Sequence, residues 1–318
     1  NIINKLNALT KNGIKGYKAS FQAFLNNGIY TINCEEKENI LVNMYENSSV
    51  ALIYGAAGTG KTTLIKHLTY FYGNEKKICL ANTNSAVENL KSNVNNQNSD
   101  FMTVHKFISK YNNNTECDIL IIDECSTISN SDMRAILEKA NFSVILLAGD
   151  IYQIESITFG NGFTLSKKLI NPTSVHELNF TWRSTNQELL NLWELVRNGD
   201  DRVDEMLAKQ EFSARISEDI FTKQDDDDDL TTIVPFSVAY AVSIHKSQGL
   251  EYNSVKIIIT NEIDELVTHS IFYTAITRAK EKLKIYWSPE CQEKIISTIK
   301  HVEDNKDAYL IKNKLDRI

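Results

Sequence analysis

The chain has 318 residues, of which 42% are hydrophobic, 24% charged and 9% aromatic, which excludes a disordered or fibrous protein and allows two ordinary domains. No apolar run approaches the ~20 residues that a membrane-spanning helix needs, and an odd set of five cysteines contains no C-x-x-C pair, so we expect a soluble, cytoplasmic protein without a membrane partner. The net charge is −7, but the aspartate run 225–229 carries −5 of it, so the balance does not exclude a basic groove for nucleic acid.

The first part of the chain changes character near Val50. Residues 1–48 are polar and mostly helical by their periodicity, with Phe21, Phe24 and Leu25 spaced for one buried face. Short apolar strands then alternate with helices, which predicts an α/β fold with a parallel sheet covered on both faces. We expect strands at Val50–Tyr54, Ile78–Ala81, Ile119–Ile122 and Val144–Ala148, and helices from Lys61, near 85–94 and at 132–140.

A glycine-rich loop follows the first of these strands. Residues 55–62 read G-A-A-G-T-G-K-T and fit the pattern G-x-x-x-x-G-K-[ST] between a strand and a helix. Glycines let the backbone wrap around phosphates, Lys61 can reach the β and γ phosphates, and Thr62 can bind Mg²⁺. We therefore predict a site for ATP or another nucleoside triphosphate with Mg²⁺, in preference to a chance glycine-rich turn.

A carboxylate pair, Asp123 and Glu124, directly follows the strand Ile119–Ile122. Strand ends of a parallel sheet point into the ligand crevice, so Asp123 is assigned to the Mg²⁺ shell and Glu124 to orienting the attacking water. Taken alone, such a pair is more often a solvated strand end, and the preceding phosphate loop favours the functional interpretation.

A second alternating unit begins near Asn179. Leu189, Leu192 and Val196 mark a helix with one apolar stripe. A strand at Val255–Ile259, a helix near 271–278 and a strand at Leu283–Trp287 follow. The predicted organisation is an N-terminal helical segment at 1–48, a first domain at 49–178 and a second domain at 179–318.

Further motifs in fixed order resemble those of superfamily 1 helicases, and most of all their RecD-like branch. They lie at Ala81–Ala86, Thr103–His105, Asp123–Ser126, Gly149–Gln153, Trp182–Arg183, His245–Glu251 and Tyr273–Lys280, so that with the phosphate loop the resemblance covers roughly 50–287. It implies two tandem RecA-like P-loop NTPase domains with parallel sheets covered by helices.

The resemblance also implies residue roles. Gln153 reports the state of the γ-phosphate, Arg183 and Arg278 reach from the second domain to the transferred phosphoryl group, and Glu251 accepts a hydrogen bond from the nucleotide sugar. The catalytic set is Lys61, Asp123, Glu124, Gln153, Arg183 and Arg278. The nucleotide-binding set is Gly55, Gly58, Thr59, Gly60, Lys61, Thr62, Thr63 and Glu251, with Thr62 and Asp123 on the metal. The nucleic-acid set is Thr83, Asn84, Thr103, His105, His245, Lys246 and Ser247, where a purely structural role has nearly equal weight for His105.

The implied activity is an ATP-dependent helicase or translocase that steps 5′ to 3′ on single-stranded nucleic acid, DNA being favoured over RNA, with hydrolysis at the interdomain cleft. One alternative is a nucleic-acid-stimulated ATPase or sensor module that has a protein partner in a larger complex and does not unwind. A second is a P-loop kinase or switch that is independent of nucleic acid. Stimulation by single strands and strand displacement separate the three.

Two features depart from the family pattern. Glu36 stands where the family has a glutamine that reads adenine, so the enzyme either reads the base with another residue or accepts several nucleoside triphosphates. The stretch between Arg183 and His245 is short and offers no strongly apolar strand before Ile233, which would leave a sheet with unpaired backbone groups. We expect that an inserted segment is missing from the sequence near 223–229. The start at Asn1 in place of methionine also suggests that the sequence is incomplete.

Overall fold

The computed structural model describes residues 2–94, 98–110, 115–154, 161–209, 212–215, 243–244, 247 and 249–300. These residues fall into two units whose boundary lies between Arg183 and Ser184, a few residues beyond the predicted boundary. The predicted segment 1–48 belongs to the first unit. The expected gap near 223–229 and the candidates His245 and Lys246 lie outside the described residues.

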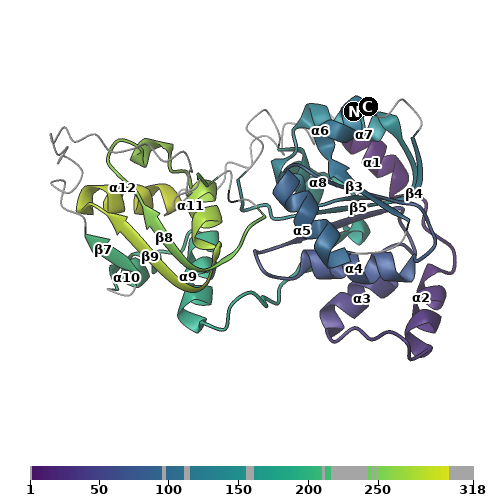
Figure 1. The fold of residues 1–318 in the computed structure, drawn as a ribbon, viewed down its shortest axis with the longest axis horizontal. Helices are drawn as coiled ribbons and strands as arrows, with labels where there is room; N and C mark the ends of the chain where they lie inside the picture. Colours follow the sequence, from purple (N-terminus) through teal and green to yellow (C-terminus); the bar gives the residue numbers. More distant parts are fainter. Residues whose placement is uncertain are drawn as a thin grey trace, which may run out of the picture. The chain divides into compact units, whose positions relative to one another are not determined.

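A parallel sheet forms the centre of the first unit (Figure 1). Central strands of such a sheet are buried on both faces, which explains why the sequence shows them as continuous apolar runs. Every described pairing is parallel, as predicted, and the order is β3-β2-β4-β5-β1-β6. The strands are β1 (Val50–Gly55), β2 (Lys77–Ala81), β3 (Ser99–Thr103), β4 (Thr115–Ile122), β5 (Ala140–Gly149) and β6 (Val175–Leu178).

Helices cover both faces of this sheet. Alternate residues of β1 supply the two cores: Ala51 and Ile53 belong to one, and Val50 and Leu52 to the other. The first core is completed by α2 (Tyr17–Asn26), α3 (Glu35–Asn43), α4 (Lys61–Phe71) and α5 (Asn84–Val94). The second core is completed by α1 (Ile2–Leu9), α6 (Val104–Lys110), α7 (Asn130–Lys139) and α8 (Gly162–Leu169).

The N-terminal helices are part of this body and not a separate domain. Phe21 of α2 is fully buried, and its ring lies 4.5 Å from the ring of Phe71 at the end of α4. Leu6 of α1 is fully buried in the core on the opposite face. The apolar stripe predicted from Phe21, Phe24 and Leu25 therefore packs against α4, the helix that follows the glycine-rich loop.

The second unit has a smaller described sheet with the order β7-β9-β8, again parallel. The short strand β7 lies in the stretch where the sequence offers no strongly apolar strand before Ile233. It was missed because its three residues, Ser213, Ala214 and Arg215, form no apolar run. The elements are α9 (Gln187–Asn198), α10 (Val203–Ala208), β7 (Ser213–Arg215), β8 (Tyr252–Ile258), α11 (His269–Ile276), β9 (Ala279–Trp287) and α12 (Pro289–Lys300).

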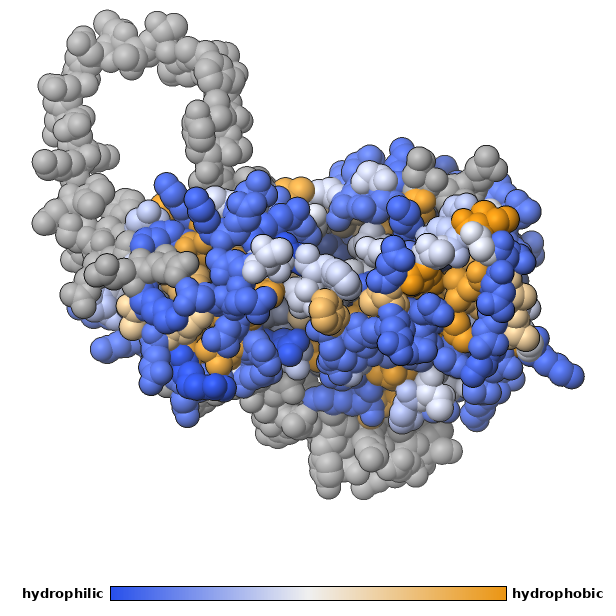
Figure 2. All heavy atoms as spheres, turned by 90° about the horizontal axis from the view of Figure 1, so that it is seen from below, coloured by the Kyte–Doolittle hydropathy of each residue, from blue (hydrophilic) through white to orange (hydrophobic). Residues whose placement is uncertain are grey.

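The surface turned toward the viewer in Figure 2 is mostly hydrophilic, and apolar residues are seen in small groups between polar ones. Among the described residues, no helix is long and apolar enough to cross a bilayer. The large hydrophobic side chains that stay exposed include Phe180 and Trp182, which follow β6.

Candidate active site

The predicted chemical residues gather at one edge of the first sheet. In the sheet order, β4, β5, β1 and β6 are neighbours, and all of them run in the same direction. Their carboxyl ends therefore meet at one edge, where they are followed by Asp123, Asp150, the phosphate loop and the segment 179–183. Topology alone thus brings four separate stretches of sequence to one place.

The glycines of the phosphate loop have no room for side chains. Gly58 and Gly60 adopt left-handed φ angles of 79° and 83°, a region that side chains rarely enter. A Cβ added to Gly58 would lie 2.3 Å from Cβ of Arg183, and one added to Gly55 would lie 2.6 Å from the carbonyl oxygen of Leu178. Thr59 is fully buried and donates from Oγ1 to the carbonyl of Ala56 at 2.9 Å, so it shapes the loop from inside.

Lys61 lies folded against its own loop. Its Nζ donates to the carbonyls of Gly55 at 2.8 Å and Ala56 at 3.0 Å. Burial lowers the pKa of Lys61, the nearby carboxylates of Asp150 and Asp123 oppose that effect, and the positive charge of Arg183 adds to it. The charges that act on Lys61 thus include those of three predicted catalytic residues, Asp123, Glu124 and Arg183. Asp150 was not predicted as a site residue, although its place directly after β5 could have indicated it.

Thr62 and Asp123 supply adjacent oxygen atoms. Thr62 Oγ1 donates to Asp123 Oδ2 at 3.3 Å, and Asp123 is 8% exposed. Burial raises the pKa of Asp123, while the backbone N–H of Glu124, the charge of Lys61 and the Thr62 hydroxyl act against that rise. Hydroxyl and carboxylate oxygens suit Mg²⁺, which commonly takes few protein ligands beside substrate phosphates and water. The donor set therefore fits the predicted metal. The described residues contain no cluster of three or more histidine, cysteine or acidic side chains for a dedicated metal site.

The remaining predicted residues of this edge lie in its turns. Glu124 has a left-handed φ of 53°, which is uncommon outside glycine and occurs at functional sites. Gln153 is half-buried in the turn after β5, and its backbone N–H donates to the carbonyl of Asp150 at 3.3 Å. Thr63 is exposed in the first turn of α4.

Arg183 belongs to the first unit and not to the second, which corrects its predicted assignment. A backbone hydrogen bond connects its segment to the first unit: the N–H of Trp182 donates to the carbonyl of Gly58 at 2.8 Å. Glu36 fixes the same segment: its Oε1 accepts from the backbone N–H of Asn179 at 2.8 Å, and its Oε2 accepts from that of Phe180 at 3.4 Å. The Glu36 carboxylate therefore holds the segment that carries Arg183 against α3.

The predicted site residues of the second unit that the structure describes make their contacts with other residues of that unit. Arg278 is 4% exposed, and its guanidinium donates to the carbonyls of Thr274 at 3.1 Å and Leu250 at 3.2 Å. Glu251 forms an ion pair of 2.9 Å with Lys280. Ser247 is buried, and its hydroxyl donates to the carbonyl of Ile244 at 2.7 Å within its own loop.

The nucleic-acid candidates of the first unit lie at two helix starts. Thr83 Oγ1 accepts from the N–H of Ala86 at 3.2 Å at the beginning of α5, and Thr103 Oγ1 accepts from that of Lys106 at 3.3 Å at the beginning of α6. Both hydroxyls therefore serve as helix caps. Asn84 and His105 are exposed beside them. These residues also follow the carboxyl ends of β2 and β3, on the same sheet edge as the phosphate loop.

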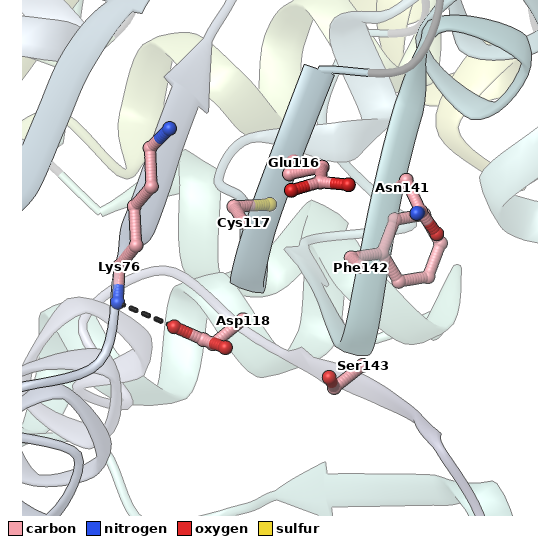
Figure 3. Close-up of a pocket in the computed structure, with 7 residues that line it drawn as sticks. All are labelled: Lys76, Glu116, Cys117, Asp118, Asn141, Phe142 and Ser143. Carbon is pink, nitrogen blue, oxygen red and sulfur yellow. Dashed lines mark hydrogen bonds between the residues drawn. The ribbon is translucent and has the colours of Figure 1, made fainter.

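A separate hollow of about 360 Å³ lies at the opposite edge of the sheet (Figure 3). It is formed where β4 and β5 begin, and the N–H of Lys76 donates to Asp118 Oδ2 at 2.7 Å beside it. Its lining residues are Lys76, Glu116, Cys117, Asp118, Asn141, Phe142 and Ser143. None of them is a predicted site residue, so the hollow is distinct from the nucleotide site.

Comparisons with protein families match most of the chain. The family described as AAA domain matches residues 35–218, and the family described as UvrD-like helicase C-terminal domain matches residues 238–286. The RecBCD enzyme subunit RecD of Mycolicibacterium smegmatis is 41% identical over 46 residues, which are 14% of this chain and 8% of RecD. RecD of Buchnera aphidicola is 31% identical over 55 residues, which are 17% of this chain and 9% of RecD. The chain thus spans less than a tenth of these relatives.

Solved structures share the fold. A structure of two Pif1 helicases unwinding forked double-stranded DNA has a TM-score of 0.57 at 15% identity and covers 91% of this chain and 98% of its own. The Bacteroides Pif1 helicase in complex with ADP-AlF3 and single-stranded DNA has a TM-score of 0.55 at 15% identity and covers 90% of this chain and 97% of its own. Both confirm the predicted RecA-like α/β fold.

Proposed function

The chain belongs to the AAA domain family and carries a UvrD-like helicase C-terminal domain, as RecD- and Pif1-like superfamily 1 helicases do, and we propose that it is an ATP-driven helicase or translocase acting on single-stranded DNA. One observation carries this proposal. Lys61, the Thr62–Asp123 pair and Arg183 meet beside the phosphate loop although they come from separate stretches of sequence. Together they supply a lysine for the phosphates, oxygen ligands for a metal ion and an arginine for the transferred group, which phosphoryl transfer from a nucleoside triphosphate requires.

The first unit would bind the nucleotide and position the water molecule that attacks the γ-phosphate. The N-terminus of α4 and the loop N–H groups hold phosphate oxygens, and Lys61 exchanges its two carbonyl partners for the β and γ phosphates. Thr62 and Asp123 would hold Mg²⁺, which neutralises phosphate charge when bound. Glu124 orients the water, and Gln153 follows the state of the γ-phosphate. The strained φ of Glu124 supports its role, because strain of this kind persists where a side chain must be held in one place.

Two arginines would neutralise the transferred phosphoryl group. Arg183 is already placed beside the loop by the Trp182–Gly58 hydrogen bond. Arg278 would act from the second unit when the two units close on the nucleotide, and Glu251 would receive the sugar. The buried hydrogen bonds of Arg278 to Thr274 and Leu250 support this role, since a fixed guanidinium loses little entropy on binding phosphate.

Nucleic acid would lie along the ends of β2 and β3, near the exposed Asn84 and His105, and reach His245 and Lys246 of the second domain. Such donors bind phosphate oxygens without reading bases. A Pif1 relative of known structure holds single-stranded DNA, which favours DNA over RNA, and the RecD-like motifs favour 5′ to 3′ stepping. RecD is itself named as a subunit of an enzyme, so a protein partner in a larger complex is part of the proposal.

A nucleic-acid-stimulated ATPase without strand displacement is the second candidate function. Its support is that RecD, a relative over part of the chain, is named as one subunit of a larger enzyme, in which a single module need not unwind DNA by itself. Displacement of a tailed duplex distinguishes the two, since a translocating ATPase that cannot unwind hydrolyses ATP and leaves the duplex intact.

The deciding experiment measures ATP hydrolysis with single-stranded DNA, with single-stranded RNA and with neither. We expect strong stimulation by DNA, and loss of hydrolysis in every condition for Lys61→Ala. Lys66→Ala is the matched control, because Lys66 is an exposed lysine on the same helix. Hydrolysis that no nucleic acid stimulates supports the P-loop switch instead, and unchanged hydrolysis in Lys61→Ala rules out the assigned site.

A further inference from the structure

Lys37 is a buried lysine beside the nucleotide loop to which no sequence motif gave a role. It lies in the first turn of α3, one residue after Glu36, and is 3% exposed. Lysine is almost never this deeply buried unless its charge has a partner. Its position therefore requires an explanation from the groups around it.

The side chain of Lys37 ends at the N-terminus of α4. A Cβ added to Gly60, the residue that caps this helix, would lie 2.9 Å from Cε and 3.0 Å from Nζ of Lys37. The ring of Trp182 lies on another side, with its centre 5.3 Å from Nζ. The ammonium group thus lies next to the phosphate loop and the segment that carries Arg183.

The protein itself satisfies this ammonium group poorly. Among the described residues, its one hydrogen bond goes to Sγ of Cys34 at 3.7 Å, and a thiol is a weak acceptor. The Trp182 ring adds a cation–π contact. An ammonium carries three N–H donors, and burying its charge without a strong acceptor is costly. Such a group is well suited to receive an anion.

Neighbouring charges increase the attraction for an anion at this point. The backbone N–H groups at the start of α4 present the positive end of the helix dipole. Lys61 begins the same helix. The positive potential is therefore concentrated where the proposed function places phosphate.

We propose that Lys37 is a second cationic ligand of the nucleotide, which donates to a phosphate oxygen beside Gly60. This inference rests on the proposed function and deepens it by assigning a binding residue outside the phosphate-loop motif. The competing explanation is that the aliphatic part of Lys37 merely fills space beneath Trp182.

The test compares nucleotide affinity in Lys37→Met, Lys37→Gln and Lys37→Arg, with Lys66→Met as the matched control. Methionine keeps the length and apolar stem of lysine and removes its charge, and glutamine gives a second neutral variant should methionine fold poorly. The probe is ADP, measured by titration calorimetry on the full chain. We expect a loss of affinity of about tenfold or more in both neutral variants, and near-normal affinity in Lys37→Arg and Lys66→Met.

Thermal unfolding without nucleotide gives an independent measurement. Removing a poorly satisfied buried charge should raise the melting temperature of Lys37→Met by about 2 to 4 °C, while a space-filling lysine replaced by methionine should leave it unchanged or lower it. Equal ADP affinity of wild type and Lys37→Met overturns the proposal and leaves the phosphate loop intact. Failure of the wild type to bind ADP instead overturns the proposed function.

Discussion

At the scale of single residues, the phosphate loop depends on two positions that combine an unusual backbone with a close neighbour. Gly58 has a left-handed φ, and a side chain there would overlap Cβ of Arg183. Gly16 has nearly the same φ of 81° but has nothing within 4 Å of an added Cβ. Substitutions at Gly58 and Gly16 therefore separate the free-energy cost of the left-handed backbone angle from the cost of a steric overlap with a neighbour.

We expect Gly58→Ala to lose nucleotide binding, because the added methyl group displaces the segment that carries Arg183. Gly16→Ala should destabilise the fold by about 1 kcal/mol through backbone strain alone and bind nucleotide normally. Titration with ADP and urea unfolding of both variants give the two quantities. Equal nucleotide affinity in the two variants would show that Arg183 is not held through Gly58.

His176 makes the stability of the first unit depend on pH. Burial lowers its pKa from 6.5 to about 4, so between these values the unfolded chain binds more protons than the folded one. The resulting stability is fully present above pH 6.5 and is lost as the pH falls toward 4. We expect a loss of about 2 kcal/mol over this window, measured by urea unfolding.

His176→Gln should flatten this part of the pH profile, with the stability at pH 8 as the reference for each protein. His67, whose pKa is also lowered to about 4, should contribute a similar part of the slope, which therefore remains in His176→Gln. A profile that is equally steep in wild type and His176→Gln would mean that other groups cause the acid sensitivity.

At the scale of secondary structure, burial decided which elements could be predicted from the sequence. The central strands β1, β2, β4 and β5 contain apolar runs because both of their faces are covered, and their core positions matched the prediction. The edge strands β3 and β6 were missed. β3 reads Ser-Asp-Phe-Met-Thr and β6 reads Val-His-Glu-Leu, and neither gives a continuous apolar signal because each pairs on one side only.

The beginning of α9 offers a test of the second unit at this scale. Asn186 Oδ1 accepts from the N–H groups of Glu188 at 3.0 Å and Leu189 at 3.2 Å, and its Nδ2 donates to the carbonyl of Glu281 at 3.1 Å. It thus caps the helix and ties it to β9. We expect Asn186→Ala to destabilise this unit by about 1 to 2 kcal/mol.

Fluorescence of the buried Trp193 and Trp287, which both lie in the second unit, follows this unfolding. Thr185→Ala is the matched control, because Thr185 precedes the cap and is exposed. Equal stability of the two variants would contradict the capping role of Asn186.

At the scale of the whole molecule, the motifs predicted which residues meet beside the phosphate loop but not how they are distributed between the units. The phosphate loop and Asp123 were identified because their residue types and strand-end positions carry a mechanism. The place of Arg183 was not, since it depends on the backbone hydrogen bond from Trp182 to Gly58, which no residue pattern encodes. The buried charges of Asp150 and Lys37 depend likewise on tertiary packing.

We propose that hydrolysis needs residues of both units, with metal ligands and Arg183 from the first and Arg278 from the second. Replacing Arg278 should therefore spare nucleotide binding and abolish turnover. Arg278→Lys retains a positive charge but not the forked guanidinium, and Arg202→Ala is the control because Arg202 pairs with Asp200 on the surface of the same unit.

The most direct test is the rate of ATP hydrolysis stimulated by single-stranded DNA in Arg278→Lys, measured alongside ADP affinity and thermal unfolding. We predict a rate lower by about 10³-fold with ADP affinity and folding retained, and an unchanged rate in Arg202→Ala. A folded Arg278→Lys protein that hydrolyses ATP at the wild-type rate would show that hydrolysis does not need the Arg278 guanidinium.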